Sequence, residues 1–169
     1  IYDLDGNVSN LLNSLTNFET SFNNNNLEIN IIRSQKKYYS EQLLAQEQSL
    51  AEQMLNSINA QLFALRVQVN EKEADLIRNS TVYGSDHEAV LKTEENLDNL
   101  KKRLAIKTNE LIAEGLSIVD PLEYRQGLLS QILKLETTIY QLETKSLEYQ
   151  VLIDKYKEEI KALPEKQSF

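Results

Sequence analysis

Apolar side chains recur with near-heptad spacing along almost the whole chain, and this pattern predicts two long helical legs joined by one turn. The first leg covers residues 9–79 and contains neither glycine nor proline. A turn at 80–85 follows, and the pattern then returns over 86–163. At a rise of about 1.5 Å per residue, each leg would be about 105 Å long. We therefore predict an all-α fold, a long antiparallel coiled-coil hairpin.

In the first leg, the predicted seam consists of two interleaved heptad series: Leu11, Phe18, Asn25, Ile32, Tyr39, Gln46 and Gln53, and Leu15, Phe22, Ile29, Lys36, Leu43, Leu50 and Ser57. The stripe then continues from a shifted origin through Leu55, Ile58, Leu62, Leu65, Val69 and Leu76. Such a slip predicts a local change of supercoiling within one continuous helix. Lys36, Gln46 and Gln53 have two interpretations: a polar layer that sets the register, or a solvated surface that faces a neighbouring chain.

The return leg carries the cleanest pattern and is predicted in two parts, 86–114 and 121–163, separated by a break at 115–120. Its apolar series are Val90, Leu97, Leu100, Leu104 and Leu111 in the first part, and Leu128, Ile132, Leu135, Ile139, Leu142, Tyr149, Ile153, Tyr156, Ile160 and Leu163 in the second. Residues 1–8 are predicted as a linker or short strand and 164–169 as a tail. The four asparagines at 23–26 are kept in the helix, with a local kink as the alternative.

The turn contains residues whose chemistry ends one helix and begins another. Gly84 adopts a positive φ at little cost. Ser85 precedes Glu88 by three residues, the spacing of a capping box. We therefore expect the returning helix to start beside Ser85.

The break at 115–120 has comparable signals. Gly115 suits a C-cap, Asp120 an N-cap and Pro121 the first helical position. The remaining residues are too apolar for a plain surface loop, so we expect Leu116, Ile118 and Val119 to pack on the first leg or on a neighbouring subunit.

Composition narrows the classes of partner. The net charge is −8 and the sequence pI about 4.8, which argues against nucleic acid as the direct partner. The chain lacks cysteine, and no stretch approaches the roughly 18 apolar residues of a membrane span. Because the sequence opens at Ile1 and not at Met, we expect it to be a segment of a larger protein.

The sequence holds no constellation of an active site. His87 is the sole histidine and lies beside the turn, and the carboxylates occur in runs such as 71–73 and 157–159 that are typical of solvated helix faces. Tyr39, Tyr149 and Tyr156 fall on the seam, which favours packing over modification. We predict no catalytic, cofactor-binding or metal-binding residues and no enzymatic activity in this segment.

Two motifs resemble those of a known family. The loop Gly84-Ser85-Asp86-His87-Glu88-Ala89-Val90 is similar to the G-x-D-H-P-x-V-like loop that opens the returning helix in polysaccharide co-polymerases, the chain-length-determinant (Wzz-like) family. The end, Leu163-Pro164-Glu165-Lys166-Gln167, is similar to the L-P-x-x-Q-like pattern that ends their coiled coil. Glu88 departs from the family's proline. The resemblance covers roughly residues 45–169.

This resemblance implies an extracytoplasmic coiled-coil arm of a protein in the bacterial inner (cell) membrane, with the segment in the periplasm or outside the cell. Two flanking spans would anchor it, and homo-oligomeric rings would act with the machinery that builds or exports lipopolysaccharide, exopolysaccharide or capsule. Some members add a kinase domain elsewhere. The alternatives are the periplasmic hairpin of a membrane-fusion adaptor in a secretion or efflux system, and an intracellular structural coiled coil.

Overall fold

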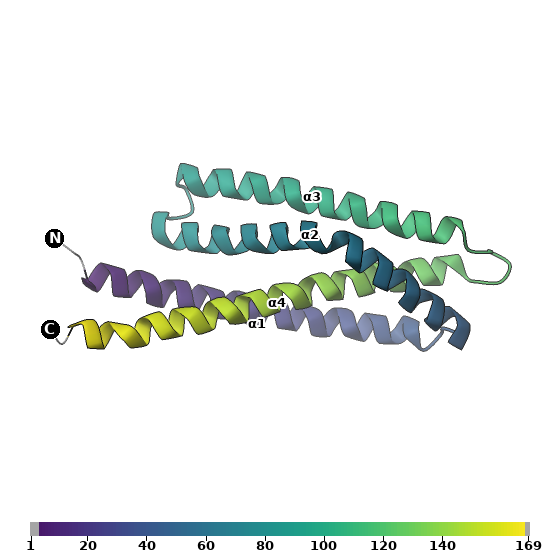
Figure 1. Ribbon diagram of the computed structural model, residues 1–169, viewed down its shortest axis with the longest axis horizontal. Helices are drawn as coiled ribbons and strands as arrows, with labels where there is room; N and C mark the ends of the chain where they lie inside the picture. The colour runs from purple at the N-terminus through teal and green to yellow at the C-terminus, as the bar shows by residue number, and fades with distance from the viewer. Residues whose placement is uncertain (1–3, 168–169) are drawn as a thin grey trace.

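The protein is all-helical, as predicted, and is built from four long helices that pack together (Figure 1). The computed structural model describes residues 4–167, and the side chains of residues 6–163. The helices are α1 (Leu4–Ser40), α2 (Ala45–Tyr83), α3 (Glu88–Ser117) and α4 (Gln126–Gln167). No strand occurs within 4–167.

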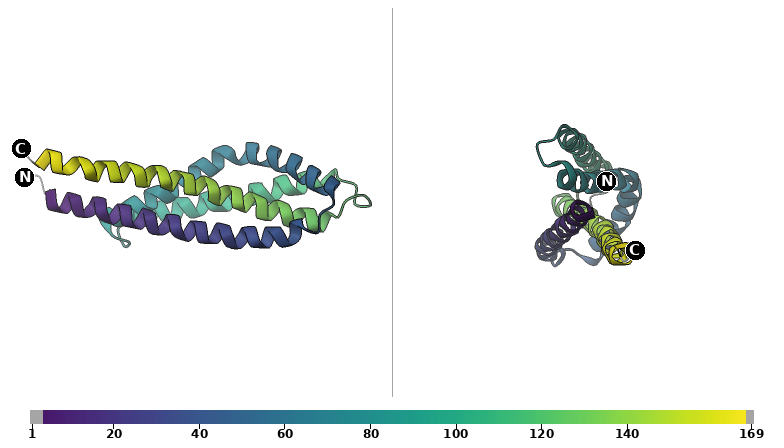
Figure 2. Two further views of the ribbon diagram at one scale, coloured as in Figure 1. Left: turned by 90° about the horizontal axis from the view of Figure 1, so that it is seen from below. Right: turned by 90° about the vertical axis from the view of Figure 1, so that its left-hand side faces the viewer.

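The four helices run alternately along one axis (Figures 1 and 2). The α1–α2 and α3–α4 connections lie at one end of the molecule, and the α2–α3 turn lies short of the other end, where α1 begins and α4 ends (Figures 1 and 2). Helices α1 and α4 lie antiparallel, with Phe18 beside Tyr149, and α2 and α3 also lie antiparallel, with Asn79 bonded to Thr93. Polar contacts such as Arg66 to Thr137 join α2 to α4. The α2–α3 turn therefore folds back toward the end where α1 begins.

The predicted continuous first leg over 9–79 is wrong, because the chain breaks at 41–44 between α1 and α2. The amides of Gln42 and Leu43 bond three residues back, to Tyr39 and Ser40, and Leu44 is extended at φ −73° and ψ 157°. The longest helix has 42 residues. At about 1.5 Å per residue it spans roughly 63 Å, far less than the 105 Å predicted for each leg.

The register of the buried face changes at this break, earlier in the chain than the slip predicted near residues 53–58. The seam residues up to Leu43 are at least partly buried, but Gln46, Gln53 and Ser57 are exposed. On α2 the buried face instead comprises Glu47, Ala51, Ile58, Leu62, Arg66, Val69, Asn70, Glu73 and Ala74. A new helix thus starts with its own register, where the sequence predicted only altered supercoiling.

At the α2–α3 turn, Gly84 has the predicted positive φ, 83°. The predicted cap at Ser85 is wrong. His87 is the N-cap of α3, and its Nδ1 accepts a hydrogen bond from the Ala89 amide at 3.0 Å. The His87 ring also stacks on the Tyr83 ring, with centroids 4.7 Å apart. This aromatic contact favours an N-cap at His87, two residues after the predicted position at Ser85.

The second break is also displaced from 115–120. Helix α3 continues through Ser117, so Gly115 lies inside it, and α4 begins only at Gln126. Asp120 does not cap α4, because α4 begins only at Gln126; its carboxylate instead accepts from the Leu122 amide within the connection, at 2.9 Å. Leu116 and Val119 pack against a cluster on α2 and α4 as expected, whereas Ile118 is 88% exposed.

Within the described residues, the secondary structure of both chain ends differs from the predicted one. Residues 4–8, predicted as linker or strand, belong to α1, and residues 164–167, predicted as tail, belong to α4. The rest of those two segments, 1–3 and 168–169, lies outside the described residues. The asparagine run stays helical, because Asn25 is buried and donates to the Leu142 carbonyl at 2.7 Å.

The core includes three apolar clusters spaced along the axis. They comprise Phe18, Ala74, Tyr149 and Ile153 near the turn, Ile58, Leu62, Leu111, Ile112 and Leu133 in the middle, and Ala51, Leu129 and Ile132 near the far end. The apolar series predicted for the return leg are all at least partly buried. Burial of each such side chain stabilises by about 1.5–3 kcal/mol, which distributes stability along the bundle.

Candidate functional site

The first site joins the α1–α2 connection to the α3–α4 connection. It lies at the end of the bundle away from the α2–α3 turn. Glu47, on the first turn of α2, is 1% exposed and receives Arg125 from the α3–α4 connection. Arg125 Nε donates to Glu47 Oε2 at 3.1 Å, and the Arg125 amide donates to the same oxygen at 3.2 Å. The hydrogen bonds from the Arg125 side chain, reinforced by backbone amides, lower the pKa of Glu47 to about 2 despite its burial.

The three polar positions of the predicted seam, Lys36, Gln46 and Gln53, differ in their surroundings. Lys36 is ion-paired within the chain, its Nζ 2.6 Å from Glu136 Oε1 on α4. This contact fits the interpretation of a polar layer that sets register. Gln46 and Gln53 are exposed on α2, as expected of the solvated alternative.

Helix α1 has an apolar face that no other helix covers. Leu27, Ile31 and Tyr38, the α1 outer face, are 63%, 61% and 65% exposed. Their spacing of four and seven residues places them on one side of the helix, away from the buried Asn25 and Ile29. Three large side chains in a row on one face form a surface suited to association.

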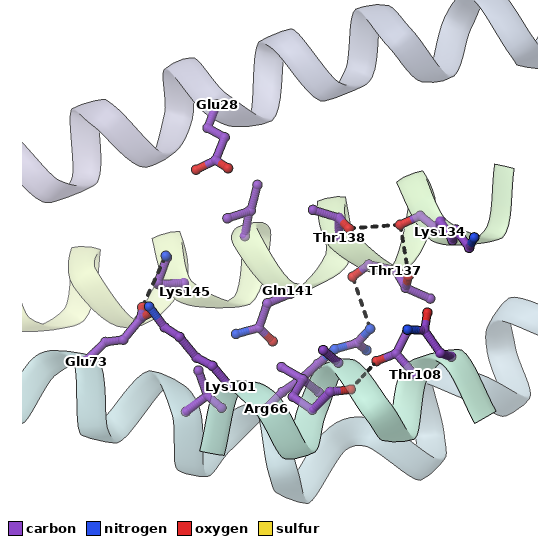
Figure 3. Close-up of a pocket in the computed structure, with 15 residues that line it drawn as sticks. Glu28, Arg66, Glu73, Lys101, Thr108, Lys134, Thr137, Thr138, Gln141 and Lys145 are labelled. Carbon is purple, nitrogen blue, oxygen red and sulfur yellow. Dashed lines mark hydrogen bonds and ion pairs between the residues drawn. The ribbon is translucent and has the colours of Figure 1, made fainter. Parts of the chain in front are cut away.

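A groove near the middle of the molecule gathers charged side chains from all four helices (Figure 3). The central groove, as we call it, is lined among others by Glu28, Arg66, Glu73, Lys101, Lys134 and Lys145. The pattern of the sequence did not point to these residues. The one available signal was Arg66, a charge four residues after Leu62 and three before Val69 on the apolar stripe.

The predicted turn residue His87 is exposed and caps α3, with no catalytic partner among the described side chains. Within residues 6–163, no group of three His, Cys, Asp or Glu side chains is arranged to hold a metal ion. The described helices include none that is both long and apolar enough to span a membrane.

Comparison with known proteins gives no relative: no family model, no curated protein and no solved structure matches the chain. Function must therefore be argued from the geometry of the helices and their surfaces.

Proposed function

We propose that this chain is the extracytoplasmic helical arm of a membrane-anchored protein that acts in bacterial surface polysaccharide biosynthesis, chain-length control or export. One observation carries the proposal. The first turn of α1 and the last turn of α4 lie at the same end of the rod in both views (Figures 1 and 2). Flanking segments at these two points would enter one membrane side by side.

The finer architecture we propose is an antiparallel coiled-coil stem made by α1 and α4, onto which the α2–α3 pair folds back. Contacts from Phe18–Tyr149 to Lys36–Glu136 follow the two helices over much of their length. The stem is about 60 Å long at the helical rise of about 1.5 Å per residue. The arm would thus be shorter and thicker than a fully extended hairpin.

The two motifs that resemble the polysaccharide co-polymerases have positions compatible with this role. The loop from Gly84 to Val90 opens α3, a returning helix. The stretch from Leu163 to Gln167 belongs to the end of α4, at the end where α1 begins.

Self-association would use the α1 outer face. Its apolar side chains are exposed in the single chain, and burying them against a second copy would remove apolar surface from water. With three such residues, the contact is small compared with stable interfaces of about 1,200–2,000 Å². We therefore expect membrane anchoring to be needed for assembly.

The test is made in cells with the full-length parent protein. Leu27→Glu combined with Ile31→Glu places two charges on the outer face, and Gln53→Glu combined with Gln61→Glu adds the same charge at exposed polar positions of α2. We expect the first pair to alter the length distribution of the surface polysaccharide and to reduce cross-linking between subunits, and the control pair to alter neither. An unchanged polysaccharide in the outer-face variant, with the protein inserted normally, would contradict the proposal.

A further inference from the structure

The central groove is large enough for a small organic molecule. Its volume is about 450 Å³, within the range of about 300–1,000 Å³ that is typical of ligand pockets. All four helices contribute to it: Glu28 comes from α1, Arg66 and Glu73 from α2, Lys101 from α3 and Lys134 from α4 (Figure 3). A ligand here would contact every element of the bundle.

Arg66 is the most unusual residue of this groove. It is 2% exposed, yet it forms no ion pair among the side chains that the structure describes. Its Nη1 donates to Asn59 Oδ1 at 2.7 Å and its Nη2 to the Thr137 carbonyl at 3.1 Å, but its buried Nε has no partner. Burial lowers the pKa of Arg66 to about 10, so the guanidinium is still charged at neutral pH. The centre of the Tyr140 ring lies 4.7 Å from Arg66 Cζ, and the ring offsets part of the cost of burying this charge. An anion in the groove would supply the counter-charge that the guanidinium lacks.

Among the other charged side chains of the groove, lysines outnumber carboxylates. Lys101 and Lys145 both reach Glu73, each with a nitrogen–oxygen distance of 3.1 Å. Lys134 forms no ion pair with the side chains that the structure describes, and Glu28 is the only other carboxylate of the lining. Four cations thus face two carboxylates, in a chain whose net charge is −8. The local excess of positive charge opposes the overall balance of the protein and favours an anion.

The uncharged lining groups offer acceptors and few donors. The hydroxyls of Thr108 and Thr138 already donate to carbonyls of their own helices, and so present oxygens that can only accept. The Gln141 amide nitrogen donates to Asn70, while its buried Oε1 has no partner. A ligand that satisfies these groups would carry hydroxyl donors in addition to its negative charge.

We propose that the central groove binds a polyhydroxylated organic anion of about monosaccharide size, with its phosphate or carboxylate at Arg66 and Lys134 and its hydroxyls directed to Gln141 and the threonines. The volume, the guanidinium without an ion-pair partner and the set of acceptors support this class together. The inference does not rest on the proposed arm function, since it concerns groups within one chain.

The test is titration calorimetry of the purified chain at low salt with four probes: glucose 1-phosphate, glucuronate, inorganic phosphate and glucose. We expect glucose 1-phosphate or glucuronate to bind saturably, and the stronger of the two identifies the anionic group. Inorganic phosphate should bind about tenfold or more weakly, and glucose should show no measurable binding. Equal binding of glucose or of inorganic phosphate would overturn the assignment, as would no binding of either sugar anion.

Matched variants test the residues. Arg66→Met should weaken binding by about tenfold or more through loss of a charge-assisted hydrogen bond, and Arg103→Met, at an exposed site on α3, should not. If Arg66→Met fails to fold by circular dichroism, Lys134→Gln replaces it, since Lys134 is exposed, with exposed Lys102→Gln as control. Equal affinities in a variant and its control would overturn the proposal. This assay measures binding to the purified chain and does not depend on polysaccharide phenotypes. A negative result here would therefore not bear on the proposed role as a helical arm.

Discussion

Arg125 ties both connections at one end of the bundle to the carboxylate of Glu47. Its Nη2 also donates to the Gln42 carbonyl at 2.6 Å, while Glu47 Oε1 accepts the Leu44 amide at 3.0 Å. The α1–α2 connection and the α3–α4 connection are therefore held by one network of charge-assisted hydrogen bonds. This network lies where the predicted continuous leg bends back on itself.

Neutralising Glu47 should destabilise the fold. Glu47→Gln keeps an oxygen for the Leu44 amide but removes the charge that Arg125 holds, and we expect a loss of about 2 kcal/mol in the free energy of unfolding. Chemical denaturation at pH 7 measures it. Glu52→Gln, at an exposed position on the same helix, serves as control and should change stability by less than about 0.5 kcal/mol. Equal effects of both substitutions would contradict a special role for Glu47.

The contribution of Glu47 should depend on pH in a defined direction. Because its pKa is lowered from 4.5 to about 2 on folding, the stabilisation is fully present above about pH 5 and is lost as pH falls toward 2. We therefore expect the difference in melting temperature between the wild type and Glu47→Gln to shrink across this window. A difference that stays constant from pH 6 to pH 2.5 would show that the carboxylate charge is not responsible.

A cysteine pair can distinguish the folded-back bundle from an extended hairpin. Asn17 Nδ2 lies 2.9 Å from Thr81 Oγ1, although an extended leg at about 1.5 Å per residue would separate these residues by about 96 Å. The chain has no native cysteine. Asn17→Cys with Thr81→Cys should form an intramolecular disulfide on mild oxidation, detected by mass spectrometry and by a gel shift.

The control for that experiment is Thr16→Cys with Thr81→Cys, because Thr16 is exposed on another side of α1. We expect little intramolecular disulfide in this pair. Equal cross-linking in both pairs would contradict the observed side-chain geometry at Asn17, and no cross-linking in either pair would contradict the fold-back of α2 along α1.

Two glycine substitutions should have opposite effects. Gly84 has φ 83° and ψ 157°, a backbone conformation nearly restricted to glycine, so Gly84→Ala should cost about 1–2 kcal/mol of stability. At Gly127, the second residue of α4, an added Cβ meets nothing within 4 Å. Gly127→Ala should stabilise by less than about 1 kcal/mol, because alanine favours the helix but the position lies in its first turn. Thermal denaturation of both variants checks the signs, and a stabilising Gly84→Ala would show that the turn does not have this conformation.

Glu148 should behave in the opposite sense to Glu47. Burial first, and then the neighbouring carboxylate of Glu71, raise its pKa above 4.5. Its ionisation therefore opposes folding at pH 7 and stops doing so below about pH 4. We expect Glu148→Gln to stabilise at pH 7 by less than about 1 kcal/mol, since solvent screens this partly exposed group, and to have no effect at pH 4. The control is Glu158→Gln at an exposed position of α4; a gain as large there would refute the local cause.

The spacing of apolar residues determined which faces of the helices are buried, because a helix can hide only side chains that recur every three or four positions. The seam from Leu11 to Leu43 and the apolar series of the return leg follow from it. Gly84 likewise predicted its turn, since few other residues accept a positive φ. The groove was only hinted at. Arg66 is visible as a charge on an apolar stripe, but its partner carbonyl at Thr137 is 71 residues away.

Only the tertiary structure decided that the first leg breaks at 41–44. The local residues, Glu41, Gln42, Leu43 and Leu44, include no glycine or proline and are compatible with a helix. The carboxylate that caps the new helix is Glu47, and the guanidinium that holds it in place is Arg125, 78 residues later. An interaction across that separation has no local signal. Its consequence is that four helices pack as a bundle in place of two extended legs.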